Sequence, residues 1–330
     1  MVVKVPEQKL SESRFLVRPM NNDIAIQVVN LTKYYGELLA VDHISFTVRR
    51  RELFGFLGPN GAGKTTTVRM LTGVIKADEG GASILGYRAG SLKAKQVAGV
   101  VPEIANAYAD LSGWNNLMLM SELYGIPASE ARQRGASLLQ DIGLFPRKND
   151  PVKAYSKGMK QRLILCMALV SDPEVLFLDE PTSGLDVQSA CLIKDLFRSL
   201  NARGKTIFLT THDMDEANQL CDRVAIINKG RIVAIDAPEK LRMATSGRHS
   251  VEVSFNDTVD PERLARLPGV NTVQKVGDKY RLYTQNPGNL VVELVHHSCT
   301  VGLKIVSLNV LAPSLEDAFV ALTEKEAEHA

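Results

Sequence analysis

The chain has 330 residues, which is long enough for about two domains with a large buried core. Its formal net charge of +2 argues against a surface built to bind a polyanion, and a hydrophobic content of 45% is typical of a globular protein. The four cysteines form no C-x-x-C pair, so we expect buried free thiols in a reducing compartment at Cys166, Cys191, Cys221 and Cys299.

Residues 1–22 are polar, contain two prolines and lack periodicity, which predicts a flexible leader rather than a signal peptide. The longest apolar run, residues 163–170, is too short to cross a bilayer. Any action at a membrane would therefore require a separate membrane partner.

Alternating apolar residues predict a series of short strands in the next part of the chain, at residues 24–29, 40–48, 53–57, 82–85 and 99–101. Helical periodicity at 114–124 and 129–142 then predicts a helical insertion over about residues 103–171. Within it we expect Leu111, Trp114 and Leu117 to contribute to a docking surface for a partner.

The apolar run 175–178 is unbroken, which implies a strand of a parallel sheet that is covered on both faces. A helix at 187–201 and strands at 206–210 and 223–227 should complete this α/β domain, which we place at residues 23–245. The polar and basic residues 237–250 predict a linker.

Residues 246–330 are predicted to form a separate C-terminal accessory domain. Its β-α-β-β-α-β order suggests a ferredoxin-like fold, with strands at 249–255, 270–276, 279–284 and 300–309 and helices at 261–267 and 288–297. A closing helix shows an apolar stripe at Leu315, Ala318, Phe319 and Leu322. The pair His296–His297 beside Cys299 is weak evidence for a metal site.

A loop of the form G-x-x-x-x-G-K-T lies between the predicted strand 53–57 and a predicted helix at 66–71, the context that a phosphate-binding loop requires. The loop comprises Gly58, Pro59, Asn60, Gly61, Ala62, Gly63, Lys64, Thr65 and Thr66. Its N–H groups and the start of the helix suit a phosphate, Lys64 adds a positive charge, and the Thr65 hydroxyl is placed to bind Mg²⁺. A glycine loop with a purely structural role is the alternative.

Two acids end the strand 175–178. Asp179 could hold hydrated Mg²⁺ opposite the phosphates, and Glu180 could act as general base on a water. The alternative is an acid pair at a helix N-terminus. His212 follows the strand 206–210, at an edge of the sheet where ligands collect, although a single histidine is more often structural.

Ser156 and Gly158 open a helix and could bind an anion, whereas a simple N-cap at Ser156 is the alternative. Tyr35 could stack on a base, or it could serve only in packing.

Taken together, four segments resemble the motifs of ABC-type ATPases in order and spacing: Gly58–Thr66, Ser156–Arg162, Leu178–Asp186 and Thr211–His212. The resemblance covers about residues 24–245. The whole chain, including Pro313–Phe319, resembles the ATPases of ABC-2-type exporters of the drug-resistance and sodium-extrusion kind. It implies an α/β fold with a P-loop NTPase core, an antiparallel β subdomain and a helical insertion.

The resemblance also implies ATP and Mg²⁺ as ligands and a role for each matched residue. Tyr35 would stack on adenine, Lys64 and Thr65 would hold the phosphates and Mg²⁺, Glu180 would be the catalytic carboxylate, and His212 would contact the γ-phosphate. Ser156 and Gly158 would complete the site of another subunit, and Asp186 would belong to the loop that crosses between subunits.

Two positions depart from the family pattern. The signature, usually Leu-Ser-Gly-Gly-Gln, reads Tyr155-Ser156-Lys157-Gly158-Met159, so Lys157 adds a charge. Glu103 stands where the family commonly has a glutamine near Mg²⁺; a carboxylate could still coordinate the ion, but it cannot donate a hydrogen bond when ionised.

The resemblance implies a head-to-tail pair with a second copy or a homologous ATPase, an ABC-2-type permease as partner, no nucleic acid, and a peripheral position on the cytoplasmic face of the membrane. A soluble ABC ATPase acting on chromosomes or ribosomes is less compatible, because the helical insertion is short and the chain carries one nucleotide domain. A regulatory module without hydrolysis is disfavoured by the presence of Lys64, Glu180 and His212.

Overall fold

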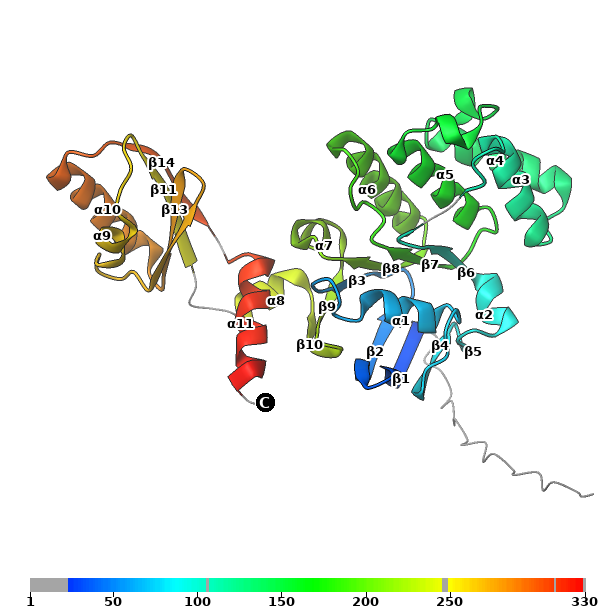
Figure 1. The fold of residues 1–330 in the computed structure, drawn as a ribbon, viewed down its shortest axis with the longest axis horizontal. Helices are drawn as coiled ribbons and strands as arrows, with labels where there is room; N and C mark the ends of the chain where they lie inside the picture. The colour runs from blue at the N-terminus through cyan, green and yellow to red at the C-terminus, as the bar shows by residue number, and fades with distance from the viewer. Residues whose placement is uncertain (1–22, 105–106, 245–248, 312, 329–330) are drawn as a thin grey trace, which may run out of the picture.

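The computed structural model of the chain describes residues 23–104, 107–244, 249–311 and 313–328, and the predicted leader at 1–22 lies outside the described residues. Figure 1 shows two β-sheets and their helices in one body and a third sheet with its own helices beside it.

An antiparallel four-stranded sheet has the order β2-β1-β4-β5. Its strands are β1 (Ile24–Tyr35), β2 (Leu38–Arg49), β4 (Glu79–Ile84) and β5 (Tyr87–Arg88). The first two strands are longer than their apolar alternation predicts, and they meet in a tight turn at Gly36, whose φ of 59° favours glycine. This sheet is the predicted antiparallel β subdomain.

The central sheet has six strands in the order β10-β9-β3-β8-β7-β6. All neighbouring pairs are parallel except β9 and β10, and the bounds are β3 (Leu53–Leu57), β6 (Ala98–Val101), β7 (Val175–Asp179), β8 (Thr206–Thr211), β9 (Arg223–Asn228) and β10 (Arg231–Asp236). Because β3, β7 and β8 are adjacent and parallel, the residues after their carboxyl ends meet at one edge of the sheet. The phosphate loop, the acid pair and His212 all follow these ends.

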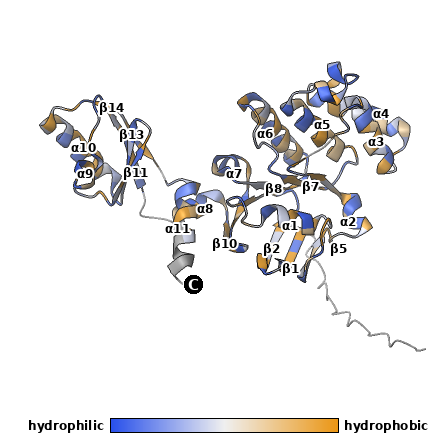
Figure 2. Ribbon diagram, viewed as in Figure 1, coloured by the Kyte–Doolittle hydropathy of each residue, from blue (hydrophilic) through white to orange (hydrophobic). Residues whose placement is uncertain are grey.

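The two faces of the central sheet are covered by different partners. One face packs on the antiparallel sheet and on α1 (Lys64–Leu71) and α2 (Leu92–Val97). A cluster of phenylalanines fills this interface, and the ring centre of Phe208 lies 5.5–6.0 Å from those of Phe46, Phe54, Phe56 and Phe177. The other face packs on α5 (Lys157–Leu169), α6 (Val187–Ala202) and α7 (Met214–Leu220). Figure 2 shows hydrophobic and hydrophilic residues on α6, whose buried residues are Ile193, Phe197 and Leu200. Burial of both faces explains the unbroken apolar sequence of β7.

The helical insertion contains α3 (Gly113–Leu123), α4 (Ala128–Asp141) and the first part of α5, with short 3₁₀ turns at Phe145–Arg147 and Val152–Ala154. The expected docking role of Leu117 is wrong, because its side chain is fully buried in the core. Leu111, which precedes α3, and Trp114, which packs against the large core, are only partly exposed.

The C-terminal part has the predicted β-α-β-β-α-β order, and its antiparallel sheet has the strand order β12-β13-β11-β14. The elements are β11 (His249–Phe255), α9 (Pro261–Ala265), β12 (Thr272–Val276), β13 (Lys279–Thr284), α10 (Pro287–Val301) and β14 (Ile305–Leu311). The last strand begins five residues later than predicted, because α10 continues to a left-handed cap at Gly302. Val251, Val253, Leu282, Leu290 and Leu294 form a separate core.

Two segments near the boundary differ from their predicted roles. Residues Pro238–Ala244, within the predicted linker, form α8, which contacts α7 and β10. The closing helix α11 (Leu315–Glu328) leaves the C-terminal sheet and packs on α7, α8 and β10. Its predicted apolar stripe is confirmed: Leu315 and Ala318 are buried, and Phe319 and Leu322 pack against the large core. The apolar stripe therefore predicts which face of α11 is buried, but it does not predict which elements cover that face.

The four cysteines are free, but only Cys166 and Cys221 are buried; Cys191 and Cys299 are exposed, contrary to expectation. Within the described ranges, no three His, Cys, Asp or Glu side chains are grouped as metal ligands, which leaves the His296–His297 pair without support. No described helix combines the length and the hydropathy that a bilayer span requires.

Candidate nucleotide site

Close backbone approaches require glycine at two positions of the phosphate loop. A Cβ atom at Gly58 would lie 2.3 Å from the carbonyl oxygen of Ile227, and one at Gly63 would lie 2.7 Å from that of Ala40. Gly63 also has φ of 107°, a value that side chains disfavour, whereas Gly61, with φ of 81°, faces open space. The loop is therefore held tightly against β2 and β9 at two points and is open at its tip.

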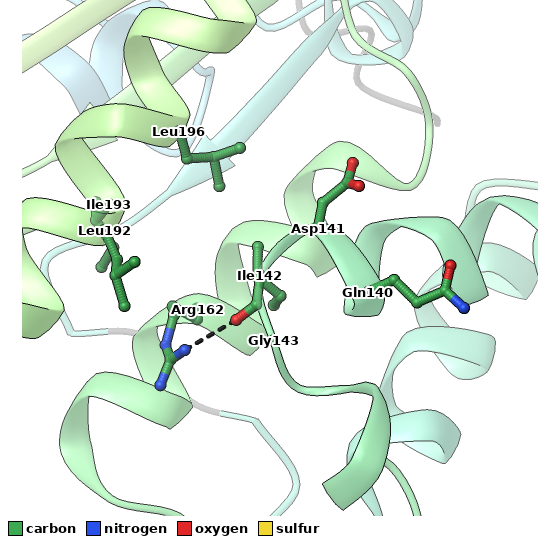
Figure 3. A pocket seen from close by; sticks show the side chains of 8 residues that line it. All are labelled: Gln140, Asp141, Ile142, Gly143, Arg162, Leu192, Ile193 and Leu196. Atoms are coloured by element: carbon green, nitrogen blue, oxygen red, sulfur yellow. Dashed lines mark hydrogen bonds between the residues drawn. The ribbon is translucent and has the colours of Figure 1, made fainter.

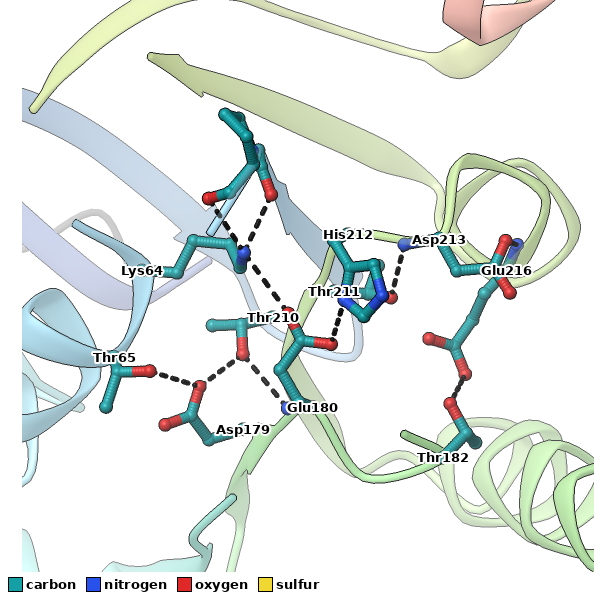
Figure 4. A network of polar contacts seen from close by, with 12 residues as sticks. Lys64, Thr65, Asp179, Glu180, Thr182, Thr210, Thr211, His212, Asp213 and Glu216 are labelled. Carbon is teal, nitrogen blue, oxygen red and sulfur yellow. Dashed lines mark hydrogen bonds and ion pairs between the residues drawn. The ribbon is translucent and has the colours of Figure 1, made fainter. Parts of the chain in front are cut away.

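Lys64 is the first residue of α1, and its side chain is only 5% exposed. The ammonium group donates to the carbonyl oxygens of Gly58 at 2.7 Å and Pro59 at 3.2 Å, within its own loop. It also lies 3.2 Å from Oε1 of Glu180, so the phosphate loop and the end of β7 share one buried cation (Figure 4).

Asp179 ends β7 and is buried between two threonines. Its Oδ1 accepts hydrogen bonds from the hydroxyls of Thr210 at 2.5 Å and Thr65 at 3.3 Å. Burial raises the pKa of Asp179, and the two threonine hydroxyls oppose this effect. The carboxyl group and the Thr65 hydroxyl thus form a pair of neighbouring oxygen donors beside the phosphate loop.

Glu180 follows directly and has a backbone conformation that is rare for a residue with a side chain. Its φ is 50°, and its N–H donates to both the carbonyl oxygen and Oγ1 of Thr210 at 3.1 Å. The carboxylate is 8% exposed and lies between two basic groups, because Oε2 is 2.7 Å from Nδ1 of His212 while Oε1 faces Lys64. The structure brings Lys64, Glu180 and His212 into one contact network.

Two residues of this region, Thr210 and Glu216, were not identified from the sequence. Thr210 bonds both Asp179 and Glu180, but within a strand a threonine is indistinguishable from an ordinary β-branched residue. Glu216, fully buried on α7, accepts a hydrogen bond from Thr182 at 2.7 Å. The spacing of Asp213 and Glu216 resembles a simple helix cap, so it gave no signal of this contact.

The start of α5 lies beside the start of α6 rather than beside the phosphate loop. Ser156 caps α5 by accepting from the N–H of Met159 at 3.2 Å. A Cβ atom at Gly158 would lie 2.3 Å from Oγ of Ser189, which itself bonds to Asp186, the N-cap of α6. The N–H and hydroxyl of Ser189 lower the pKa of Asp186. Close helix packing therefore accounts for the glycine at 158.

Lys157 in the signature segment faces the same neighbourhood. A Cβ atom added to Gly184 would lie 2.3 Å from the ammonium nitrogen of Lys157. The positive φ of Gly184, 66°, shows that a sharp turn follows the acid pair at this point. The unusual lysine thus lies against the loop that joins β7 to α6.

Within the described residues, neither Tyr35 nor Glu103 forms a hydrogen bond or an ion pair with this cluster. Tyr35 stands at the end of β1, 46% exposed, with the ammonium group of Lys33 5.7 Å from its ring centre. Glu103 is exposed just after β6, the edge strand next to β7. Their predicted roles toward adenine and Mg²⁺ remain predictions.

The residues that the structure places together suit a nucleotide phosphate and a hard divalent cation. A loop whose tip at Gly61 faces open space precedes α1, and Lys64 supplies a buried positive charge. Oxygen donors such as those of Thr65 and Asp179 are the ligands that Mg²⁺ prefers. The carboxylate of Glu180 beside His212 could orient and deprotonate a water.

A separate hollow of about 300 Å³ shares no residue with this cluster (Figure 3). It lies where α4, α5 and α6 meet and is lined by Gln140, Asp141, Ile142, Gly143, Arg162, Leu192, Ile193 and Leu196. The guanidinium of Arg162 donates to the carbonyl oxygen of Ile142 at 2.8 Å, so this charge serves to join α5 to the end of α4.

Comparison with known proteins gives consistent matches. A family described as ABC transporter matches residues 41–183. The Nod factor export ATP-binding protein I of Ralstonia nicotianae is 40% identical over 306 residues, covering 91% of this chain and 94% of that protein. The linearmycin resistance ATP-binding protein LnrL of Bacillus subtilis is 36% identical over 304 residues, covering 90% and 98%. A solved ATP-binding subunit of an ABC transporter has a TM-score of 0.62 at 29% identity and covers 67% of this chain and 92% of its own.

Proposed function

This chain belongs to the family of ABC transporter ATP-binding proteins, and from that premise we propose that it hydrolyses ATP to power export through a separate membrane permease. The observation that carries the hydrolytic part is the contact network in which Glu180 lies between Lys64 of the phosphate loop and His212. The export part is supported by relatives whose names describe Nod factor export and linearmycin resistance and whose similarity spans nine-tenths of this chain.

In this proposal the phosphate loop binds the phosphates of ATP through its N–H groups, and Lys64 neutralises part of their charge. Glu180 takes a proton from the attacking water, while His212 holds the carboxylate in position and contacts the terminal phosphate. Thr65 and Asp179 hold Mg²⁺, which when bound offsets the negative charge that develops on the phosphates. Tyr35 stacks on the adenine, and Glu103 lies near the ion.

We also propose a head-to-tail pair of two ATP-binding subunits. The start of α5, with Ser156 and Gly158, packs on the start of α6 rather than on the phosphate loop of its own chain. Ser156 is exposed at this helix start, which we propose completes the site of a second copy or of a homologous ATPase. Asp186, which lies beside them, belongs to the loop that would cross between the subunits.

The surface for the permease is proposed to lie after β6. Ile104 and Tyr108 are 78% and 61% exposed there. The buried side chain of Asn116 holds Tyr108, because it accepts from the N–H of Tyr108 at 2.8 Å and donates to its carbonyl oxygen at 3.0 Å. Exposed apolar side chains near Glu103 suit a membrane protein of the ABC-2 type as partner, and such a partner would place this subunit on the cytoplasmic face of the membrane.

The test is purification of the tagged chain from detergent-treated membranes, followed by identification of bound proteins and measurement of phosphate release. We expect an integral membrane protein of the ABC-2 permease type to co-purify and ATP to be hydrolysed. A Lys64→Ala variant should retain the permease and lose turnover. DNA and ribosomes should leave the rate unchanged. Retained turnover in Lys64→Ala would contradict the site, and stimulation by DNA or ribosomes without a bound permease would contradict the export role.

A further inference from the structure

Glu216 is a fully buried acid that belongs to none of the motifs described above. It is the third residue of α7, and its Oε1 accepts a hydrogen bond from the hydroxyl of Thr182 at 2.7 Å (Figure 4). Its Oε2 is buried and accepts no hydrogen bond of normal geometry from the described residues. Burial of a carboxyl group is unfavourable unless contacts compensate it, so the burial of Glu216 at this position calls for an explanation.

A helix cap does not explain this residue. Asp213 and Glu216 have the spacing of a capping box, in which the glutamate would accept a hydrogen bond from the N–H of Asp213. That N–H donates instead to Oγ1 of Thr211 at 3.0 Å, while Oδ1 of Asp213 accepts from the N–H of Glu216 at 3.0 Å. The side chain of Glu216 is therefore not needed to cap α7, and it is directed to Thr182.

Thr182 lies in the segment that follows Glu180. Residues 181–185 make short turns of their own, from the N–H of Ser183 to Glu180 and from the N–H of Leu185 to Thr182, each at 3.2 Å. Within the described parts of the chain, the bond between Thr182 and Glu216 is the only hydrogen bond that joins residues 181–185 to another element. Among the described residues, Glu216 is therefore the hydrogen-bonding anchor of this segment.

The position matters because Glu180 has φ of 50°. Strained backbone of this kind persists only where the neighbouring structure holds it on both sides. On one side the N–H of Glu180 is held by Thr210, and on the other the chain is held through Thr182. Glu216 also stands four residues after His212, so the same bond joins the segment to the turn that carries the histidine.

We propose that Glu216 is a positioning residue, which through Thr182 holds the segment after Glu180 against the His212 turn and so keeps the Glu180 carboxylate between Lys64 and His212. The inference rests on the proposed hydrolysis of ATP at this site. Burial raises the pKa of Glu216, with the hydroxyls of Thr182 and Thr211 acting in the opposite direction. A neutral acceptor of the same shape should therefore replace it.

The experiment compares ATP turnover in variants of both partners, each assayed well below its unfolding temperature. Thr182→Val and Glu216→Ala should lower kcat by about 10- to 100-fold, the cost of misplacing a reacting group by up to about 1 Å. KM for ATP should stay within about threefold, because the phosphate loop is untouched. Thr182→Ser and Glu216→Gln keep the donor and the acceptor, and should remain within about threefold of the wild-type kcat.

The double variant Thr182→Val/Glu216→Ala should be no slower than the slower single variant, since both remove one bond. Matched controls remove comparable buried groups elsewhere. Thr284→Val deletes a fully buried hydroxyl that accepts from the N–H of Asn286, and Glu52→Ala deletes a buried carboxylate that pairs with Arg223. Both should lower stability and leave kcat unchanged.

A wild-type kcat in Thr182→Val would overturn the inference, even if Glu216→Ala failed to fold. The inference would also be overturned if the control variants lost as much kcat as the test variants at the same loss of stability, because the loss of kcat would then follow from destabilisation in general. Absence of ATP hydrolysis in the wild-type chain with its permease would refute the proposed function instead, and the two failures are therefore distinguishable.

Discussion

Replacement of Glu180 by glutamine removes the negative charge from the centre of the contact network while keeping the shape of the side chain. At the 3.2 Å distance between Lys64 Nζ and Glu180 Oε1, the attraction is about 5 kcal/mol for an effective dielectric constant of about 20. Desolvation of both groups offsets much of this, and breaking a buried pair costs about 3–5 kcal/mol. We expect about 3 kcal/mol for Glu180→Gln, because two loop carbonyls still hold Lys64.

The expected results are a lower melting temperature without nucleotide, by about 6–10 °C, and a kcat lower by about 10²–10⁴-fold. ATP should restore more stability to this variant than to the wild type, since its phosphates take over the charge of Lys64. Calorimetry and phosphate release measure the two effects. The matched control is Glu52→Gln, which breaks the partly buried 3.1 Å pair with Arg223 at the opposite end of β3 and should lower stability only. A kcat within tenfold of wild type in Glu180→Gln would refute the assignment of Glu180 as the base.

Three further results are expected. Gly58→Ala should abolish ATP binding measured by titration calorimetry, because its Cβ would lie 2.3 Å from the backbone oxygen of Ile227, and normal affinity would show that the loop can shift. Glu103→Gln should leave hydrolysis measurable, since Glu103 is exposed and outside the cluster; complete loss of phosphate release would show that its role is misjudged. Burial raises the folded-state pKa of Glu216, so its contribution to stability is present below its unfolded pKa and is lost as pH rises from there toward the folded pKa. The melting temperature of Glu216→Gln relative to wild type should therefore increase with pH over that interval, and a pH-independent difference would contradict the raised pKa.

The chain order of the elements, the phosphate loop and the acid pair could be predicted from local patterns. The phosphate loop is recognisable because its glycines, Lys64 and Thr65 are adjacent in sequence, and the acid pair because it ends an unbroken apolar run. The apolar stripe of α11 was visible for the same reason, since 3.6-residue periodicity marks a buried face. Each of these features is encoded within a few consecutive residues.

The partners of these features were not readable in the same way. The bonds of Asp179 to Thr65 and Thr210, of Glu180 to His212 and of Glu216 to Thr182 join residues 31 to 114 positions apart. They arise because β3, β8 and β7 lie side by side in the sheet, which sequence spacing does not state. Sequence spacing likewise did not predict that α8 would form where a linker was expected, or that α11 would pack on α7.

The sequence by itself indicated a phosphate-binding loop, because such a loop is a local backbone structure that a few residues specify. Only the tertiary structure decided which groups hold the Glu180 carboxylate in place. Thr210, Thr182 and Glu216 have no distinctive sequence context, and they acquire their role from the order of parallel strands that brings their chain segments to one edge of the sheet.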